Sequence, residues 1–217
     1  LWKYALNEGA RAANAPRQLS GRGLALWQDG EDTRIIYVTP GYQMIALDGS
    51  TGRPVQSFGV EGIVDLKQNA DQMIDLETGE IGLHSTPIVA KDVVIIGAAH
   101  RTGGNPRSRE NVKGYVRGFD VRTGERLWIF HTVPMPGEYG YESWQDGSAS
   151  YTGNTGVWAQ ISVDLELETV YLPVEAATGD YFGANRPGDN LFAESLLAVD
   201  LFTWSPNALH PLSHPSL

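Results

Sequence analysis

Short apolar runs, each bounded by Gly, Pro or Asp, recur along the whole chain. Each run has the length of a strand and is rich in Val, Ile and aromatic residues, a composition typical of half-buried strands. The sequence has no long amphipathic helix pattern, and residues 65–76 supply at most a short helix. The pattern predicts an all-β chain with strands at 34–39, 42–48, 84–90, 93–99, 114–120, 126–132, 157–164, 169–175 and 195–201.

A turn motif, Asp-x-x-Thr-Gly, repeats between these strands at Asp48–Gly52 and Asp120–Gly124. The Asp side chain accepts hydrogen bonds from the turn backbone, and Gly adopts the positive φ that a type I turn with a bulge requires. The frame starts again at Asp200 and then changes to "DLFTWSPNALHPLSHPSL". Its copies stand roughly 70 to 80 residues apart, whereas a bare propeller blade needs about 40–45. The repeat predicts a β-propeller whose long inserts gather on one face and build its site.

Two tryptophans belong to this frame. Trp128 follows the second turn, and a large flat side chain there can dock between adjacent blades and bury about 150–250 Å². Trp2 is predicted to do the same for the preceding blade. We interpret both as structural residues rather than ligand contacts.

The composition argues against several classes of binding partner and several kinds of site. The 217 residues carry a net charge of −10 and no Lys/Arg run, which argues against nucleic acid and anionic membrane surfaces as partners. Cysteine is absent, so disulfides, thiolate metal sites and Cys nucleophiles are excluded. No apolar stretch approaches 18 residues, so no membrane span is expected. The chain opens at "LWKYAL" with neither Met nor a signal peptide, which suggests that it begins inside a longer protein.

Several motifs, in their order and spacing, resemble the pyrroloquinoline quinone (PQQ) dehydrogenases, and within them the branch of membrane-bound glucose dehydrogenase. The motifs are "RGLALW" at 22–27, "ALDGSTGRPVQSFG" at 46–59, "VRGFDVRTGERLWIF" at 116–130, "GVWAQISVD" at 156–164 and "NRPGDN" at 185–190. The resemblance implies an eight-bladed propeller of the quinoprotein type. Residues 1–201 would supply about three to four of its blades. Residues 202–217 are interpreted as an aberrant tail that is not propeller sequence.

The resemblance also implies a function. PQQ and a divalent cation, Ca²⁺ or Mg²⁺, would be the cofactors of a periplasmic enzyme that oxidises a sugar or alcohol. Electrons would pass to quinone or cytochrome. One alternative is a non-catalytic PQQ-like scaffold of the outer-membrane assembly kind. Another is an inactive truncated product.

Four cofactor contacts follow from the resemblance. Arg22 would clamp a PQQ carboxylate, since a guanidinium fork suits that group. Trp158 matches the tryptophan beneath the PQQ ring, and Thr155 and Gly156 before it would contact the cofactor edge. The structural alternatives are a surface arginine and a tryptophan that packs between blades. Trp27 stands where glucose dehydrogenase-like relatives have His, which leaves the sugar preference open.

A second group of cofactor contacts is predicted around two strands. Ser85 and Thr86 would supply hydroxyl groups to the PQQ edge. The backbone N–H groups of Ala98 and Ala99 would bind another carboxylate. His84 is either a proton-handling residue or a packed loop histidine, and the second is favoured.

Metal ligands are predicted from carboxylates, because Ca²⁺ prefers several oxygen ligands. Asp180 matches the metal-ligand position of the family, with a turn-capping role as the alternative. Glu110 is the candidate for a second ligand. Asp189, with Arg186 and Asn190, is expected to fix the long loop.

The catalytic residue of the family has no counterpart here. The resemblance places an Asp base in a blade after the strand that ends near Asp200, where it would help to deprotonate the substrate hydroxyl. No Asp follows Asp200. The expected frame is replaced by Pro, Ser and His, so neither a turn nor a strand is predicted there.

Overall fold

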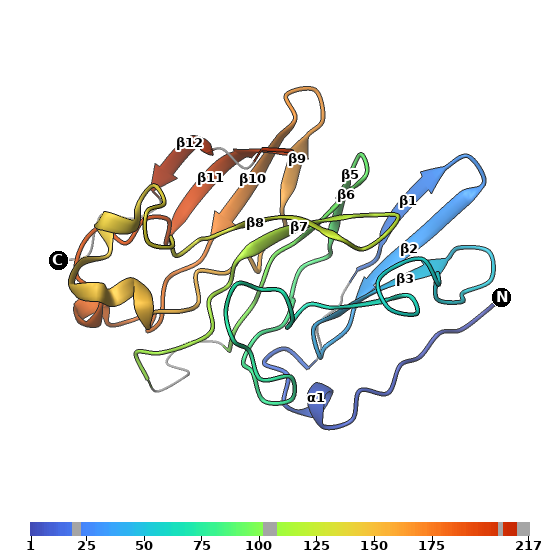
Figure 1. Cartoon of the computed structure of the whole chain (residues 1–217), viewed down its shortest axis with the longest axis horizontal. Coiled ribbons are helices and arrows are strands. Elements are labelled where there is room, and N and C mark those ends of the chain that lie inside the picture. Colours follow the sequence, from blue (N-terminus) through green and yellow to red (C-terminus); the bar gives the residue numbers. More distant parts are fainter. Residues whose placement is uncertain (19–22, 102–107, 204–205, 212–217) are drawn as a thin grey trace.

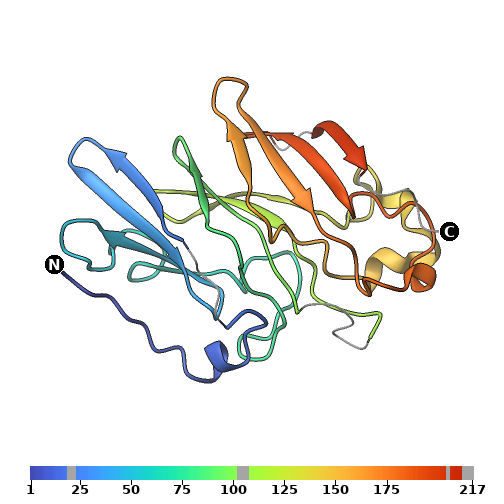
Figure 2. The ribbon, with the colours of Figure 1, turned by 180° about the vertical axis from the view of Figure 1, so that it is seen from behind.

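The computed structural model describes residues 1–18, 23–101, 108–203 and 206–211. Its strands form three antiparallel four-stranded sheets, each built from strands consecutive in sequence. We call them the first, second and third blades. They stand side by side in chain order, from the blue first blade to the orange and red third (Figures 1 and 2). This arrangement confirms the predicted all-β partial propeller.

The first blade contains β1 (Ala25–Asp29), β2 (Asp32–Val38), β3 (Gln43–Asp48) and β4 (Ile63–Asp65). The second contains β5 (Ile88–Ala90), β6 (Val93–Ile96), β7 (Val116–Asp120) and β8 (Arg126–Phe130). The third contains β9 (Ser162–Asp164), β10 (Thr169–Val174), β11 (Ser195–Asp200) and β12 (Pro206–Pro211). Helical structure in the described residues is limited to α1 (Ala10–Ala13) and three short 3₁₀ segments, Tyr141–Ser143, Gln145–Ser150 and Gly183–Asn185.

The core explains why β6 is apolar at every position. Val94 and Ile96 pack toward the first blade, whereas Val93 and Ile95 pack toward the third. All four side chains are buried. A strand that alternates its side chains between two covered faces shows a continuous apolar run. The second blade is therefore a sheet held between two neighbours.

The predicted turns form as expected. Asp48 accepts hydrogen bonds from the backbone N–H groups of Ser50 (3.1 Å) and Thr51 (2.7 Å), and Gly52 has a φ of 69°. The turn at Asp120 repeats this pattern, with Gly124 at a φ of 73°. A further copy, missed in the sequence, occurs at Asp75, which accepts hydrogen bonds from Glu77 and Thr78 in an insert.

Aromatic side chains dock on these turns. The Trp2 ring covers Gly52, where an added Cβ would lie 2.3 Å from the indole, and the Trp2 Nε1–H donates to the carbonyl of Gly49 (3.1 Å). Trp128 packs in the core between the second and third blades. The first blade has no tryptophan at the matching position, and Phe58 packs against Gly124 of the second blade instead.

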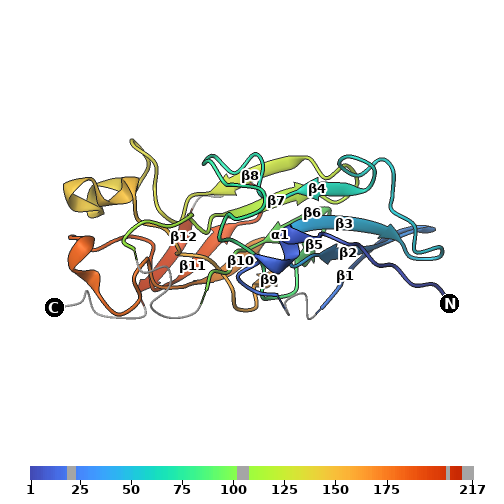
Figure 3. The same cartoon turned by 90° about the horizontal axis from the view of Figure 1, so that it is seen from below.

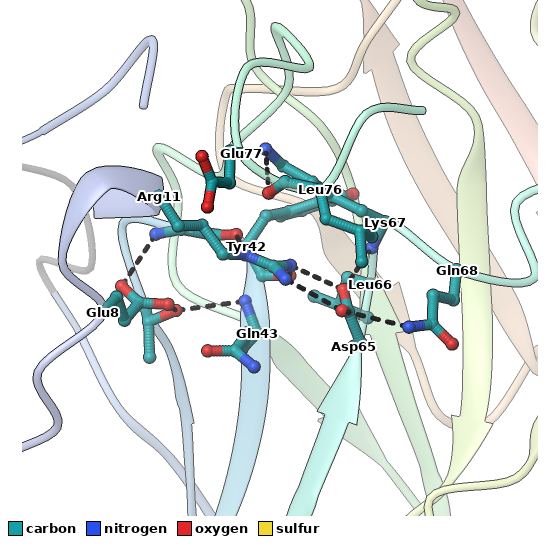
Figure 4. A network of polar contacts seen from close by, with 12 residues as sticks. Glu8, Arg11, Tyr42, Gln43, Asp65, Leu66, Lys67, Gln68, Leu76 and Glu77 are labelled. Atoms are coloured by element: carbon teal, nitrogen blue, oxygen red, sulfur yellow. Dashed lines mark hydrogen bonds and ion pairs between the residues drawn. The ribbon is translucent and has the colours of Figure 1, made fainter. Parts of the chain in front are cut away.

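The N-terminal segment is tied to the first blade by a polar network (Figure 4). Arg11 of α1 donates to Asp65 at the end of β4, with 2.8 Å between Nη1 and Oδ2. Glu8 accepts hydrogen bonds from the Thr39 hydroxyl (2.6 Å) and from the N–H of Gly41 (2.9 Å). These contacts hold residues 8–11 across the turn between β2 and β3.

Several expectations need correction. Strands β1 and β4 were not predicted, and residues 65–76 form turns rather than a helix. Asp200 does form the expected turn, accepting from the N–H of Thr203 (2.7 Å), and β12 pairs with β11. The prediction that no turn or strand follows Asp200 was wrong, because an open sheet edge pairs through backbone groups and needs no particular side chains. That the tail is foreign to the propeller stays a prediction.

Candidate functional site

A cavity of about 460 Å³ opens beside the third blade. Trp158 and Ala159 line it from the segment before β9. Residues 173–176 line it from the end of β10, and Asp180 and Glu194 from the loop between β10 and β11. Two of the predicted site residues, Trp158 and Asp180, therefore share one cavity.

Trp158 offers a partly open aromatic surface, with 42% of the residue exposed. The His84 ring meets it edge-on, with 5.9 Å between ring centroids and an interplanar angle of 65°. Close backbone packing fixes the segment before Trp158. A Cβ on Gly97 would lie 2.1 Å from the Val157 carbonyl oxygen, and one on Gly156 would lie 2.4 Å from the Ala98 carbonyl oxygen. Because glycine has no Cβ, Gly97 and Gly156 allow the second blade to approach the segment before Trp158 this closely.

Three carboxylates also line the cavity, those of Glu175, Asp180 and Glu194. Burial raises the pKa of Asp180 above its ordinary value, and the nearby charge of Glu175 adds to that rise. Arg186 and His100 act in the opposite direction and lower the pKa of Asp180. The cavity therefore presents an aromatic floor beside a group of acidic side chains.

Glu175 is held by two contacts. Its Oε1 lies 3.0 Å from Nδ1 of His100 and accepts a hydrogen bond from the N–H of Gly156 (3.2 Å). Sequence reasoning missed both Glu175 and His100. A signal existed for His100, because it directly follows Ala98 and Ala99, which were predicted as site residues.

Arg22 falls outside the described residues. The next residue, Gly23, packs against Thr86, where a Cβ would lie 2.0 Å from the Thr86 Oγ1. Ser85 is buried, and its Oγ has no hydrogen-bond partner within the described part of the chain. The serine thus keeps a free hydroxyl next to His84 in the sequence.

Three of the remaining predicted cofactor contacts, those of Thr155, Gly156 and Ala99, are engaged within the protein. The Thr155 hydroxyl lies 3.0 Å from the Thr132 hydroxyl, and the Gly156 N–H is the donor to Glu175. The N–H of Ala99 donates to the Gly82 carbonyl (2.8 Å), and the Ala98 carbonyl faces Gly156.

Glu110 is exposed and is not among the residues that line the cavity. Across the described ranges, no group of three or more His, Asp or Glu side chains is arranged to hold a metal ion by itself. In the β10–β11 loop, Arg186 donates to Asn190 (2.9 Å), as expected for a contact that fixes this segment. The 3₁₀ segment 145–150 packs against the same loop, since the N–H of Gln145 donates to the Pro187 carbonyl (2.9 Å; Figure 3).

Trp27 lies in β1 between the first two blades and is 6% exposed. Its Nε1–H donates to Asp92 (3.0 Å), and the Arg122 guanidinium lies 4.6 Å from the ring centroid. In this structure Trp27 joins two blades. In the part of the chain that the structure describes, no helix has the length and apolar character needed to cross a membrane.

Residues 1–206 match the family model described as glucose/ethanol/alcohol dehydrogenase, beta-propeller domain. The chain is 32% identical over 183 residues to the quinoprotein glucose dehydrogenase of Escherichia coli K12, covering 82% of this chain and 22% of that protein. It is 26% identical over 223 residues to the glycerol dehydrogenase large subunit of Gluconobacter oxydans, covering 99% of this chain and 28% of that subunit.

Solved structures agree on the fold. The quinohemoprotein alcohol dehydrogenase of Comamonas testosteroni superposes with a TM-score of 0.69 at 23% identity, over 92% of this chain and 29% of that chain. A europium-containing methanol dehydrogenase gives the same TM-score and identity over 98% of this chain and 36% of that chain. The chain thus spans about a fifth to a third of the length of these proteins.

Proposed function

Because the chain belongs to the glucose/ethanol/alcohol dehydrogenase β-propeller family, we propose that it is part of a PQQ-dependent dehydrogenase. The whole enzyme oxidises a sugar or alcohol hydroxyl group in the periplasm and passes electrons to quinone or cytochrome. The observation that carries the proposal is the exposed indole of Trp158 in one cavity with Asp180.

The residues present fit PQQ, a planar tricarboxylate. A rigid indole provides stacking area at low entropic cost. The buried Oγ of Ser85 has no hydrogen-bond partner among the described residues, and so it can bind a polar group of a ligand. When bound, PQQ supplies the oxidising group of the reaction. Trp158 would support its ring, and the family resemblance implies that Arg22, Ser85 and Thr86 would contact its edge.

A divalent cation completes the proposed site. The cavity is lined by carboxylates and PQQ is an anion, so their direct contact would be repulsive. A hard cation such as Ca²⁺ or Mg²⁺ binds oxygen ligands from both partners and removes this repulsion. Asp180 is the proposed protein ligand. Glu110, given its exposed position, remains a sequence-based prediction as the second.

Equilibrium binding of PQQ to the 217-residue chain, with Ca²⁺ present, tests the proposal. Trp158→Ala should weaken binding about 5- to 10-fold, the value of an aromatic stacking contact. Trp2→Phe is the matched control, because Trp2 is a partly exposed tryptophan docked on the Gly49–Gly52 turn. Equal binding by both variants, or no binding by the unaltered chain, would favour the non-catalytic scaffold.

A further inference from the structure

The turn that leads into Trp158 contains a residue in an unusual backbone conformation. Thr155 has a φ of 55°, in the left-handed region, although its side chain is branched at Cβ. Asn154 before it has a φ of 56°. Asparagine tolerates this region, whereas a β-branched residue is an outlier there and keeps the conformation only if its surroundings hold it. The conformation of Thr155 must therefore be maintained by the contacts around it.

The Thr155 hydroxyl makes two such contacts inside the protein. Its Oγ1 lies 3.0 Å from the hydroxyl oxygen of Thr132, which follows β8, and 2.5 Å from the Asn154 carbonyl oxygen. Each hydroxyl has one proton, so Thr132 donates to Thr155 and Thr155 donates to the carbonyl. Both threonines are fully buried, so a hydroxyl that lost its partner would not recover one from bulk water.

Backbone contacts hold the same turn on two further sides. The Asn154 N–H donates to the Val112 carbonyl before β7 (2.9 Å), and the Thr155 N–H donates to the Ala176 carbonyl after β10 (3.3 Å). The hydroxyl contact to Thr132 adds a link to the segment after β8. Three separate segments of the chain thus fix the turn, and only the link to Thr132 joins two side chains.

Two residues connect Thr155 to Trp158, and both are closely packed. Val157 is fully buried, and a Cβ on Gly156 would lie 2.4 Å from the Ala98 carbonyl oxygen. The backbone direction set at Thr155 therefore passes to the tryptophan with little freedom. Because Trp158 is 42% exposed, its own ring contacts constrain the indole less than this backbone does.

We infer that the buried Thr132–Thr155 hydroxyl pair holds the left-handed turn, and that both threonines are positioning residues that orient the Trp158 indole for the cofactor. The inference rests on the proposed function, in which Trp158 supports PQQ. It replaces the direct cofactor contact that the family resemblance gave to Thr155. It also gives a reason for a β-branched residue in a left-handed turn.

Fluorine NMR of the 217-residue chain, labelled with fluorotryptophan, tests the positioning role without PQQ. Trp158→Phe identifies the Trp158 resonance. Thr155→Val and Thr132→Val preserve the side-chain shape and remove one hydroxyl. Either change should move the Trp158 resonance toward its position in the unfolded chain. The resonance of Trp27, which is buried between the first two blades, should stay where it is.

Thr152→Val is the matched control for these variants. It makes the same change three residues earlier, where the buried Thr152 Oγ1 has no hydrogen-bond partner among the described residues. It should leave the Trp158 resonance unchanged. Thr155→Ser keeps the hydroxyl and should also leave it unchanged. Unfolding midpoints identify a variant that fails to fold, and Thr132→Val tests the same contact from outside the turn.

Binding of PQQ with Ca²⁺ present separates positioning from direct contact. Thr155→Val should weaken binding about 2- to 10-fold, the range of one hydrogen bond. In a Trp158→Ala background the same change should have no further effect, because Thr155 acts through the indole. A further loss in that background would show that Thr155 contacts PQQ itself and would overturn the inference.

The remaining outcomes distinguish the inference from the proposed function. An unmoved Trp158 resonance in Thr155→Val and Thr132→Val, with lowered unfolding midpoints, would show that the pair is only structural. An equal shift in Thr152→Val would also overturn the inference, because any change in the segment would then move the indole. If the unaltered chain does not bind PQQ, the proposed function fails, and the fluorine spectra still decide whether the hydroxyl pair orients Trp158.

Discussion

At the scale of single residues, hydrogen bonds within a turn change the pKa of the turn aspartate. The Asp48 carboxylate accepts hydrogen bonds from the Ser50 hydroxyl, the Thr51 hydroxyl and the Thr51 N–H, each at 2.7 Å. These contacts stabilise the ionised form and lower the pKa of Asp48 to about 2. The side chain therefore stabilises the turn mainly while it is charged.

This pKa shift gives a pH dependence with a definite sign. A carboxyl whose folded pKa is lowered contributes stability above its unfolded pKa of about 3.9, and loses it as the pH falls toward about 2. The unaltered chain should therefore have a higher unfolding midpoint than Asp48→Asn. The difference between the two midpoints should be largest above about pH 4. The gap should close toward pH 2 in thermal melts. A gap independent of pH would refute the assignment.

The candidate site was predictable to the extent that its residues stand in recognisable motifs. Trp158 and Asp180 were predicted separately and line one cavity. Glu175 was read as the end of an apolar strand, and His100 as a residue of an insert. Their contact spans 75 positions and depends on how two blades pack, which local pattern does not encode. Long-range pairing of this kind explains most of what sequence reasoning missed.

At the scale of elements, glycine sets how closely strands and blades approach. Gly118 in β7 is paired with Trp128 in β8, and a Cβ on Gly118 would lie 1.8 Å from the indole. The strand has room for the tryptophan because position 118 has no side chain. Strand β1, which starts at Ala25, was not predicted, because it directly follows the glycines of "SGRGLALW".

A double-mutant cycle tests the Gly118–Trp128 fit. Gly118→Ala should lower the free energy of unfolding by about 1–3 kcal/mol, the usual cost of overpacking a core. In a Trp128→Leu background the same change should cost much less, because the clashing ring is gone. Chemical denaturation of the four chains measures the coupling. Equal costs in both backgrounds would show that Gly118 is required for another reason.

At the scale of the whole molecule, an arc of blades exposes surface that neighbouring blades would cover. Leu24, just before β1, and Leu26, within it, are 60% and 62% exposed. Apolar side chains of this size on a sheet face normally mark a contact surface. If the chain is part of a whole propeller, as proposed, a neighbouring blade would pack here.

The same openness leads to the last prediction, that the 217-residue chain alone will not oxidise any sugar or alcohol, even with PQQ and Ca²⁺. The cavity has an aromatic floor, but Trp158 remains 42% exposed, so bound cofactor would face water. No Asp follows Asp200 to act as the general base that the family resemblance places in a later blade. Weak cofactor binding should survive, because Trp158 and Asp180 are in place. A dye-linked dehydrogenase assay, run with and without both cofactors, measures this directly. PQQ-dependent turnover by the purified chain would show that three blades are enough for catalysis and that a residue within them replaces the missing base.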